Sequence, residues 1–303
     1  MKTLLIFIDG VGIGKKDKNY NPLFFTELPN LKKLFNGKIP SYRNKYLQSD
    51  LATLVPADAK LGVEGLPQSG TGQTSIFCGI NAPKIIGKHF GPHPYSTLVP
   101  VIEQNNIFTV LKSKGKKVGF LNAYPKQFFD YLASGKTRLT VTTMSCIMSG
   151  VKLFSISELE KGKALSADIT NDNWHKLGYN IKTITPYQAG KRLCKEALNY
   201  DFSLYEYFYT DHAGHSQQKE FASSVLINLD GFLGGLCENY DPQKLFVFII
   251  SDHGNIEDLS IKTHTLNSVP VILMGANKEK YAKHIKNIAD IYHQIIQLVD
   301  INV

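Results

Sequence analysis

Short apolar runs recur along the chain, and polar or glycine-rich sequence separates them. Runs of five or six mostly apolar residues are typical of strands that are buried on both faces of a parallel sheet. The runs of this kind are Thr3–Ile8, Lys117–Leu121, Leu204–Tyr209, Leu245–Ile250 and Val269–Met274. We therefore expect a sheet in which most strands run parallel.

Between these runs, apolar residues recur at the spacing of amphipathic helices. Gln217–Leu236 carries one such stripe, made of Ala222, Val225, Leu226, Leu229, Phe232 and Leu233. A second stripe near the C-terminus is made of Ile285, Ile288, Tyr292, Ile295 and Val299. Tyr187–Leu198 follows Pro186, and proline is common at the start of a helix. Strands that alternate with helices predict a doubly wound α/β fold, with helices flanking a mostly parallel sheet.

The stretch from Lys126 to Thr185 departs from this alternation. It is polar and less periodic than the rest, and it contains the only tryptophan, Trp174. We predict that residues 126–185 form a small cap insertion over a site, and that residues 1–125 and 186–303 form the core.

The composition is that of a soluble globular protein, because 43% of the 303 residues are hydrophobic and 20% are charged. No apolar run approaches the about 20 residues that a membrane-spanning helix needs. The N-terminal run ends at Asp9 with no small-residue cleavage site after it, which distinguishes it from a signal peptide. We therefore expect a cytoplasmic protein with no membrane partner.

The four cysteines and the net charge narrow the possible classes of protein and partner further. Cys78, Cys146, Cys194 and Cys237 form no CxxC pair, which argues against a disulfide framework or a zinc knuckle and predicts free thiols. The net charge of +8 favours anionic partners. A small phosphorylated molecule and a nucleic acid both fit that charge.

Three of the apolar runs are followed closely by an acid: Asp9, Asp211 and Asp252. Ligands of open α/β sheets bind beyond the carboxyl ends of the strands, so these acids are well placed for a site. A single acid in such a position is more commonly a turn residue or a helix cap.

Three histidines lie at the edges of the same apolar runs. His215 follows Asp211 by four residues, His253 is next to Asp252, and His264 precedes the run Val269–Met274. Carboxylates and imidazoles together suit zinc or manganese. We therefore predict a metal centre at this edge of the sheet.

The stretch Gly65–Pro83, GLPQSGTGQTSIFCGINAP, is rich in Gly, Ser and Thr and turns apolar at Ile76. That pattern is typical of a loop that leads into the N-terminus of a helix, where backbone amides bind an anion. It is not a P-loop, because no Gly-Lys-Ser/Thr follows at the required spacing.

Together these motifs resemble those of the alkaline-phosphatase superfamily, and within it the branch of cofactor-independent phosphoglycerate mutase and phosphopentomutase. The mutase patterns D-H-G-N-A-E and H-T-x-N-x-V-P are similar to Asp252–Glu257, DHGNIE, and His264–Pro270, HTLNSVP. The patterns D-x-x-G-H and D-G-x-G are similar to Asp211–His215 and Asp9–Gly12. The motifs occur in the family's order and cover both ends of the chain, but not its middle.

The resemblance implies an alkaline-phosphatase-like fold, two divalent metal ions and a hydroxyl nucleophile. It places one metal on Asp211, His215 and His264, and the other on Asp9, Asp252, His253 and the nucleophile. In the family the nucleophile lies eight residues before a glycine, and counting back from Gly79 gives Thr71. Ser69, Thr74 and Ser75 are the competing hydroxyls.

Residues that contact the substrate are harder to identify. Lys84, Lys88, His89 and His93 follow the predicted nucleophile helix, and one of them is a candidate for binding the substrate phosphate or the leaving group. Asn255 is a candidate for orienting the loop or a group near the metals. The alternative for the residues that follow the helix is an ordinary solvated loop.

The family's mutases carry a substantial inserted domain, whereas residues 126–185 offer only 60 residues for a cap. We therefore expect a two-metal phosphohydrolase, a phosphatase or phosphodiesterase, that acts on a small phosphorylated metabolite through a phosphothreonine. On this reading no nucleic-acid partner is expected. One alternative is a compact phosphomutase or phosphotransferase. Another is a non-catalytic module that binds metal or phosphate.

Overall fold

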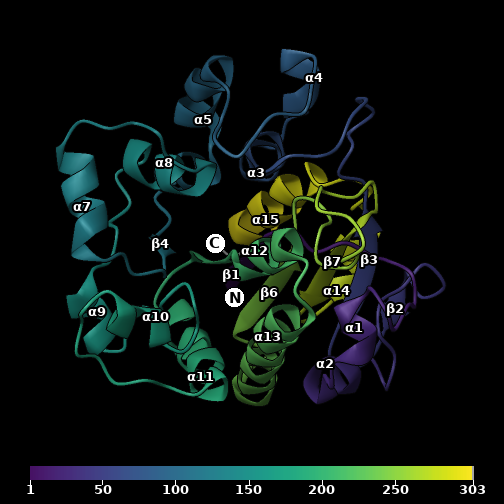
Figure 1. The fold of residues 1–303 in the computed structure, drawn as a ribbon. Helices are drawn as coiled ribbons and strands as arrows, with labels where there is room; N and C mark the ends of the chain where they lie inside the picture. Colours follow the sequence, from purple (N-terminus) through teal and green to yellow (C-terminus); the bar gives the residue numbers. More distant parts are fainter. Residues whose placement is uncertain (302–303) are drawn as a thin grey trace.

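One mixed sheet forms the centre of the computed structural model, which describes residues 1–301 (Figure 1). Its seven strands follow the order β2-β3-β7-β6-β1-β5-β4. The strands are β1 (Lys2–Ile8), β2 (Leu47–Gln48), β3 (Thr53–Ala57), β4 (Val118–Phe120), β5 (Phe202–Tyr207), β6 (Leu245–Ile250) and β7 (Val269–Met274). Strands β4, β5, β1 and β6 are parallel neighbours, whereas β7, β3 and β2 pair antiparallel.

The central strand β1 is buried on both faces, as its apolar run predicts. Leu4 and Ile6 contribute to one buried cluster, whereas Leu5 and Phe7 contribute to another on the opposite face. This alternation follows from the two-residue period of a strand. The sheet therefore separates two cores.

Helices cover both faces of the sheet (Figure 1). The helices whose side chains join the first cluster are α1 (Pro22–Phe25), α2 (Pro29–Leu34), α9 (Ile156–Glu160), α10 (Asp172–Lys176), α11 (Pro186–Ala197), α12 (Tyr209–Ser216) and α13 (Lys219–Asn239). Those that join the second are α3 (Ser69–Cys78), α4 (Ala82–Ile86), η1 (Ser96–Leu98), α5 (Val99–Asn105), α6 (Ile107–Ser113), α7 (Lys126–Ala133), α8 (Val141–Met148), α14 (Lys278–Ala282) and α15 (Asp290–Ile301). The predicted α/β fold with helices on both sides of the sheet is confirmed.

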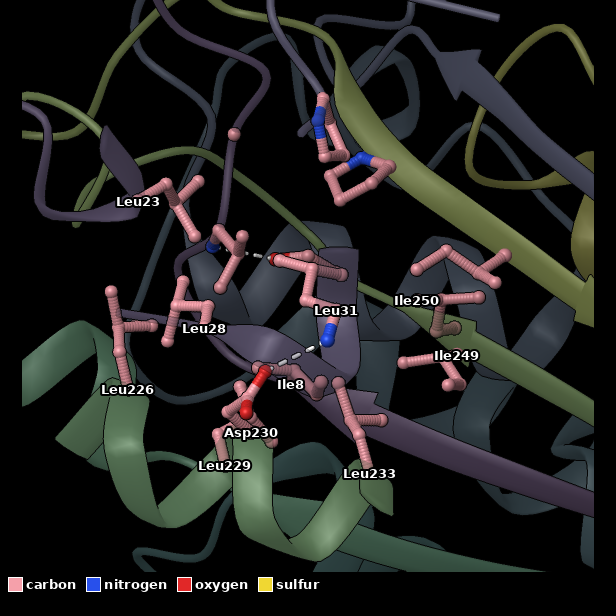
Figure 2. A pocket seen from close by; sticks show the side chains of 16 residues that line it. Ile8, Leu23, Leu28, Leu31, Leu226, Leu229, Asp230, Leu233, Ile249 and Ile250 are labelled. Carbon is pink, nitrogen blue, oxygen red and sulfur yellow. Dashed lines mark hydrogen bonds between the residues drawn. The ribbon is translucent and has the colours of Figure 1, made fainter. Parts of the chain in front are cut away.

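An apolar cavity lies on the first face, between β1, β6 and α13 (Figure 2). Its one acidic wall residue, Asp230, is buried and accepts hydrogen bonds from the backbone N–H groups of Asn30 and Leu31, at 3.1 and 2.8 Å. These bonds satisfy the free N–H groups at the start of α2. The acid therefore belongs to the packing of the fold.

Several predicted elements differ in their bounds or direction. The strand expected at Leu204–Tyr209 ends at Tyr207, because Tyr209 already begins α12. Strand β7 occupies the expected residues but runs antiparallel to β6. Ile285 and Ile288 precede α15 rather than forming its first turn. Strand β3 was not expected; in it Pro56 lies opposite Pro270 of β7.

The stretch 126–185 contains four short helices, and all four contribute side chains to the two buried clusters. Six residues of α8, from Val141 to Cys146, are buried, and its apolar members join the second cluster. The boundary between core and cap therefore stays a prediction.

Two predictions from composition are met in the described residues. Cys78, Cys146, Cys194 and Cys237 are all free thiols, and the first three are buried. Within residues 1–301, no helix is both long enough and apolar enough to span a membrane.

Candidate metal centre

The three predicted acids meet at one edge of the sheet. Asp9 follows β1 directly, Asp252 lies two residues after β6, and Asp211 lies in the first turn of α12, just after β5. Because β5, β1 and β6 are adjacent and parallel, their carboxyl ends open onto the same place.

Asp9, Asp252 and His253 form the first group. Nε2 of His253 lies 3.2 Å from Oδ1 of Asp9 and 3.6 Å from Oδ2 of Asp252. All three residues are buried. Their ligand atoms lie within 4.8 Å of one another, which is close enough to share one ion.

Asp211, His215 and His264 lie beside this group. Nε2 of His215 is 3.3 Å from Oδ2 of Asp211 and 3.2 Å from Nε2 of His264. The rings of His253 and His264 stack with centroids 3.7 Å apart. Asp211, His253 and His264 also form a group that could hold one ion, so His253 lies between the two sets of ligands.

The ring orientation of two histidines suits a metal. Nδ1 of His215 donates to the carbonyl of Lys262 at 2.8 Å, and Nδ1 of His264 donates to the carbonyl of Pro67 at 2.7 Å. A carbonyl can only accept, so these bonds fix the proton on Nδ1 and leave the Nε2 lone pair facing the cluster.

The carboxylates lack the partners that buried acids need. Neither side-chain oxygen of Asp252 has a hydrogen-bond partner, although the residue is fully buried, and Oδ1 of Asp9 also has none. In the described part of the chain, the ion-pair partners of Asp9, Asp211 and Asp252 are all histidines. A buried carboxylate without a partner is costly, so the residues present fit a bound divalent cation.

The pKa values report the same crowding of charge. Burial and the charge of Asp252 raise the pKa of Asp9 to about 8, and burial also raises the pKa of Asp252. Burial alone would lower the pKa of His253, but the charges of Asp252 and Asp9 raise it to about 10. Burial and the charge of His253 lower the pKa of His264 to about 4. A cation between the carboxylates would offset their mutual repulsion.

Glu257 connects the loops that carry these ligands, and the sequence patterns gave it no role. Its Oε2 accepts from the backbone N–H groups of Gly12 and Asn255, both at 2.8 Å. Its Oε1 accepts from Oγ1 of Thr265 at 2.5 Å and from Nδ2 of Asn267 at 2.8 Å. Position 12 requires glycine, because a Cβ there would lie 2.1 Å from Oε1 of Glu257. The buried carboxylate thus ties the loop after β1 to the connection between β6 and β7 and braces that connection internally.

Asn255 contacts a predicted metal ligand directly. Its Nδ2 donates to Oδ1 of Asp211 at 2.6 Å and to the backbone carbonyl of the same residue at 3.2 Å. The residue is fully buried. This contact suits the orienting role expected for Asn255.

The hydroxyl nearest the cluster is that of Ser69, not that of Thr71. Oγ of Ser69 lies 3.0 Å from Nε2 of His253. The hydroxyl of Thr71 instead donates to the carbonyl of Gln68 and accepts from the N–H of Phe90, both at 3.2 Å. Successive helix residues are rotated by about 100°, so Ser69 and Thr71 on α3 point in nearly opposite directions. The geometry therefore favours Ser69 as the nucleophile and argues against our prediction of Thr71.

Helix α3 brings Ser69 close to the acids. Ser69 is its first residue, and a Cβ on Gly72 would lie only 3.0 Å from Cβ of Asp252. The N-terminus of a helix attracts anions, because its free N–H groups and its dipole favour negative charge. A phosphoryl group on Ser69 would therefore lie at the positive end of α3.

The predicted substrate residues divide into two sets. Lys88 and His89 line an open groove together with Gln68, which precedes α3. Nζ of Lys88 lies over the rings of Phe90 and Tyr95, at 5.7 and 5.3 Å from their centroids. Lys84 is exposed on α4 and does not line the groove.

Comparison with known families gives a match over the whole chain. The model of the family described as "Metalloenzyme superfamily" matches residues 1–303. A curated relative, the 2,3-bisphosphoglycerate-independent phosphoglycerate mutase of Pyrococcus abyssi, is 20% identical over 260 residues, which are 75% of this chain. The aligned region is 59% of that mutase, so the chain spans about three fifths of its length.

Solved structures share the fold. A protein from Pyrococcus horikoshii superimposes with a TM-score of 0.59 and 15% identity, covering 99% of this chain and 96% of the other. Alkaline phosphatase from the Antarctic bacterium TAB5 gives a TM-score of 0.53 and 13% identity, covering 99% and 98%. The predicted alkaline-phosphatase-like fold is confirmed.

Proposed function

We propose that this chain, which belongs to the Metalloenzyme superfamily, is a phosphohydrolase that releases phosphate from an ester of a small metabolite through a phosphoserine at Ser69. The observation that carries this proposal is the position of the Ser69 hydroxyl, 3.0 Å from Nε2 of His253 and at the N-terminus of α3. A nucleophile there lies beside an anion-binding helix end and a cluster of metal-binding side chains.

The cluster would hold two divalent cations, zinc or manganese. Asp9, Asp252 and His253 would bind one, and Asp211, His215 and His264 the other, with His253 positioned near both. Bound cations would neutralise the phosphate oxygens and lower the pKa of a coordinated hydroxyl. Glu257 and Asn255 would hold the ligand loops and Asp211 in place without touching the substrate.

The chain's own groups account for two displacement steps. In the first, Oγ of Ser69 forms a bond to phosphorus, the bond from phosphorus to the leaving alcohol breaks, and the serine proton passes to solvent. The departing alkoxide takes a proton from water. In the second, a water oxygen bonds to phosphorus and Ser69 regains its proton as the phosphoserine bond breaks. The products are the free alcohol and inorganic phosphate.

The second candidate function is a phosphomutase, in which the phosphoryl group returns from Ser69 to another hydroxyl of the same molecule. The names of the curated relatives favour it. The short stretch 126–185 favours hydrolysis, because an intermediate held for re-phosphorylation has to be shielded from water. A third candidate, a binding module without catalysis, fits the unpartnered oxygens of Asp252 but gives no reason for a hydroxyl beside His253.

The product distinguishes these functions. The protein is treated with a chelator, reloaded with Mn²⁺ or Zn²⁺, and incubated with a panel of phosphate monoesters and diesters. We expect inorganic phosphate, and we expect the chelated protein to release none. Formation of an isomeric ester without free phosphate would show that the protein is a mutase and not a hydrolase. Metal binding without either product would leave only the binding module.

A further inference from the structure

A cavity of 210 Å³ lies between the stretch 126–185 and the end of β5. We call it the insertion cavity; its wall includes Tyr124, Asp168, Asn173, Trp174, Glu206 and Tyr209. The wall thus combines aromatic rings with acids and an amide, the composition of a site for an organic group with hydroxyls.

The insertion cavity adjoins the metal cluster through β5 and α12. Glu206 on β5 pairs with Phe7 on β1, and Asp9 follows two residues after Phe7. Tyr209 begins α12, the helix that carries Asp211. The cavity wall and the metal cluster therefore lie at the same edge of the sheet.

The polar wall groups are held in place. Oε1 of Glu206 accepts from Oγ1 of Thr142 at 3.1 Å, and the side chain is nine-tenths buried. The backbone of Glu206 is fixed by Asn122, whose amide exchanges two hydrogen bonds of 2.8 Å with it. Asp168 accepts from the backbone N–H of Asn173 at 2.6 Å. The acids cannot easily move away from a bound group.

The charge of the wall points to one class of substrate. Among the described residues that line the cavity, none is Lys, Arg or His. A carboxylate bound there would be desolvated beside Asp168 and Glu206 with no cation to pair with it, which is strongly unfavourable. A hydroxyl can hydrogen-bond to the same wall groups without that penalty.

Resting on the proposed function, we propose that the insertion cavity holds the alcohol part of the substrate and selects phosphate esters of uncharged alcohols over esters that carry a carboxylate. Glycerol 3-phosphate and 3-phosphoglycerate test this directly, because they share a three-carbon skeleton and differ in a hydroxymethyl group against a carboxylate. We expect phosphate release with a higher kcat/KM from glycerol 3-phosphate.

A single added cation should shift this preference. Leu177 lines the cavity and is 47% exposed, so Leu177→Arg adds a positive charge with little risk to folding. We expect it to raise kcat/KM for 3-phosphoglycerate, relative to kcat/KM for glycerol 3-phosphate, about fivefold. This factor corresponds to the ~1 kcal/mol of a favourable, partly exposed ion pair. Leu198→Arg is the matched control, because Leu198 is 38% exposed and does not line the cavity. It should leave the ratio unchanged.

A second variant tests whether the substrate occupies the insertion cavity, without adding a charge. Ala167 lines the cavity, and Ala167→Leu would narrow it. We expect a higher KM for both esters and an unchanged inhibition constant for inorganic phosphate, which needs only the metal cluster.

The outcomes separate this inference from the proposed function. If phosphate is released equally from both esters, and neither Leu177→Arg nor Ala167→Leu alters the constants, the cavity assignment is wrong while hydrolysis stands. If neither ester is hydrolysed, the proposed hydrolysis fails for both. The cavity assignment is then tested by the ratio of the two Kd values, measured on metal-loaded protein. Equal Kd values that Leu177→Arg does not separate would overturn the inference.

Discussion

Oγ of Ser69 lies 3.0 Å from Nε2 of His253, although the two residues are 184 positions apart in the chain. Helix α3 presents the hydroxyl from the second face of the sheet, and the loop after β6 presents the imidazole. This contact places the proposed nucleophile beside His253, and the first prediction depends on it.

Ser69→Ala should reduce phosphate release at least about a thousandfold, because it removes the atom that bonds to phosphorus. Thr71→Val should retain most of the activity and lose some stability, because the N–H of Phe90 then loses its acceptor. Initial rates and urea unfolding of both variants check this. The opposite order of activities would restore Thr71 as the nucleophile.

Removal of single histidines should empty the metal sites unequally. The resemblance to known families predicts that His253 and His264 serve different ions, but the structure places His253 within reach of both groups. We therefore expect His264→Ala to retain about one metal ion per chain and His253→Ala to weaken both sites. Metal content after dialysis, measured by elemental mass spectrometry, decides this. Loss of one ion from each variant would support the assignment in which His253 and His264 each bind a different ion.

Glu257→Gln should weaken metal binding about 10- to 100-fold, the usual effect of removing a group that orients ligands. An amide has only one acceptor oxygen, whereas the carboxylate of Glu257 accepts from four donors. The control is Glu103→Gln at an exposed position of α5, which makes the same change of charge. Titration with a competing chelator gives the affinities. A parallel fall in both variants would show that net charge, not loop geometry, is responsible.

Stability should depend on pH through Glu206. Burial and the charge of Asp9 raise its folded pKa to about 8 from 4.5, so the folded state binds more protons than the unfolded state between these values. Its contribution to stability is therefore lost as the pH rises from about 4.5 to 8. Glu206→Gln removes this term and should become progressively more stable relative to wild type from pH 5 to pH 8. Urea unfolding of metal-free protein at both pH values measures it, and a constant difference would contradict the pKa shift.

The clustering of the acids and histidines could be predicted because parallel neighbours deliver their carboxyl ends to one edge. Asp9 and Asp252 follow adjacent strands, so short-range pattern and sheet topology agree for them. Strand β3 was not predicted, because its pairing depends on distant residues in β7.

The nucleophile and the role of Glu257 could not be read from spacing. Counting back from Gly79 cannot show which side of α3 faces the loop after β6, and a difference of two residues reverses the direction of the side chain. Three of the four bonds of Glu257 stay within the connection between β6 and β7, but the fourth reaches Gly12, 245 positions away, and only the folded chain reveals it.

The central claim is that the phosphoryl group passes through Ser69. Metal-loaded protein is mixed with a phosphate ester that it hydrolyses, quenched in acid during turnover, digested and sequenced by mass spectrometry. We predict a phosphoryl group on Ser69 and none on Thr71, Thr74 or Ser75. A phosphoryl group on Thr71, or turnover with no phosphorylated residue in Ser69–Cys78, would contradict it.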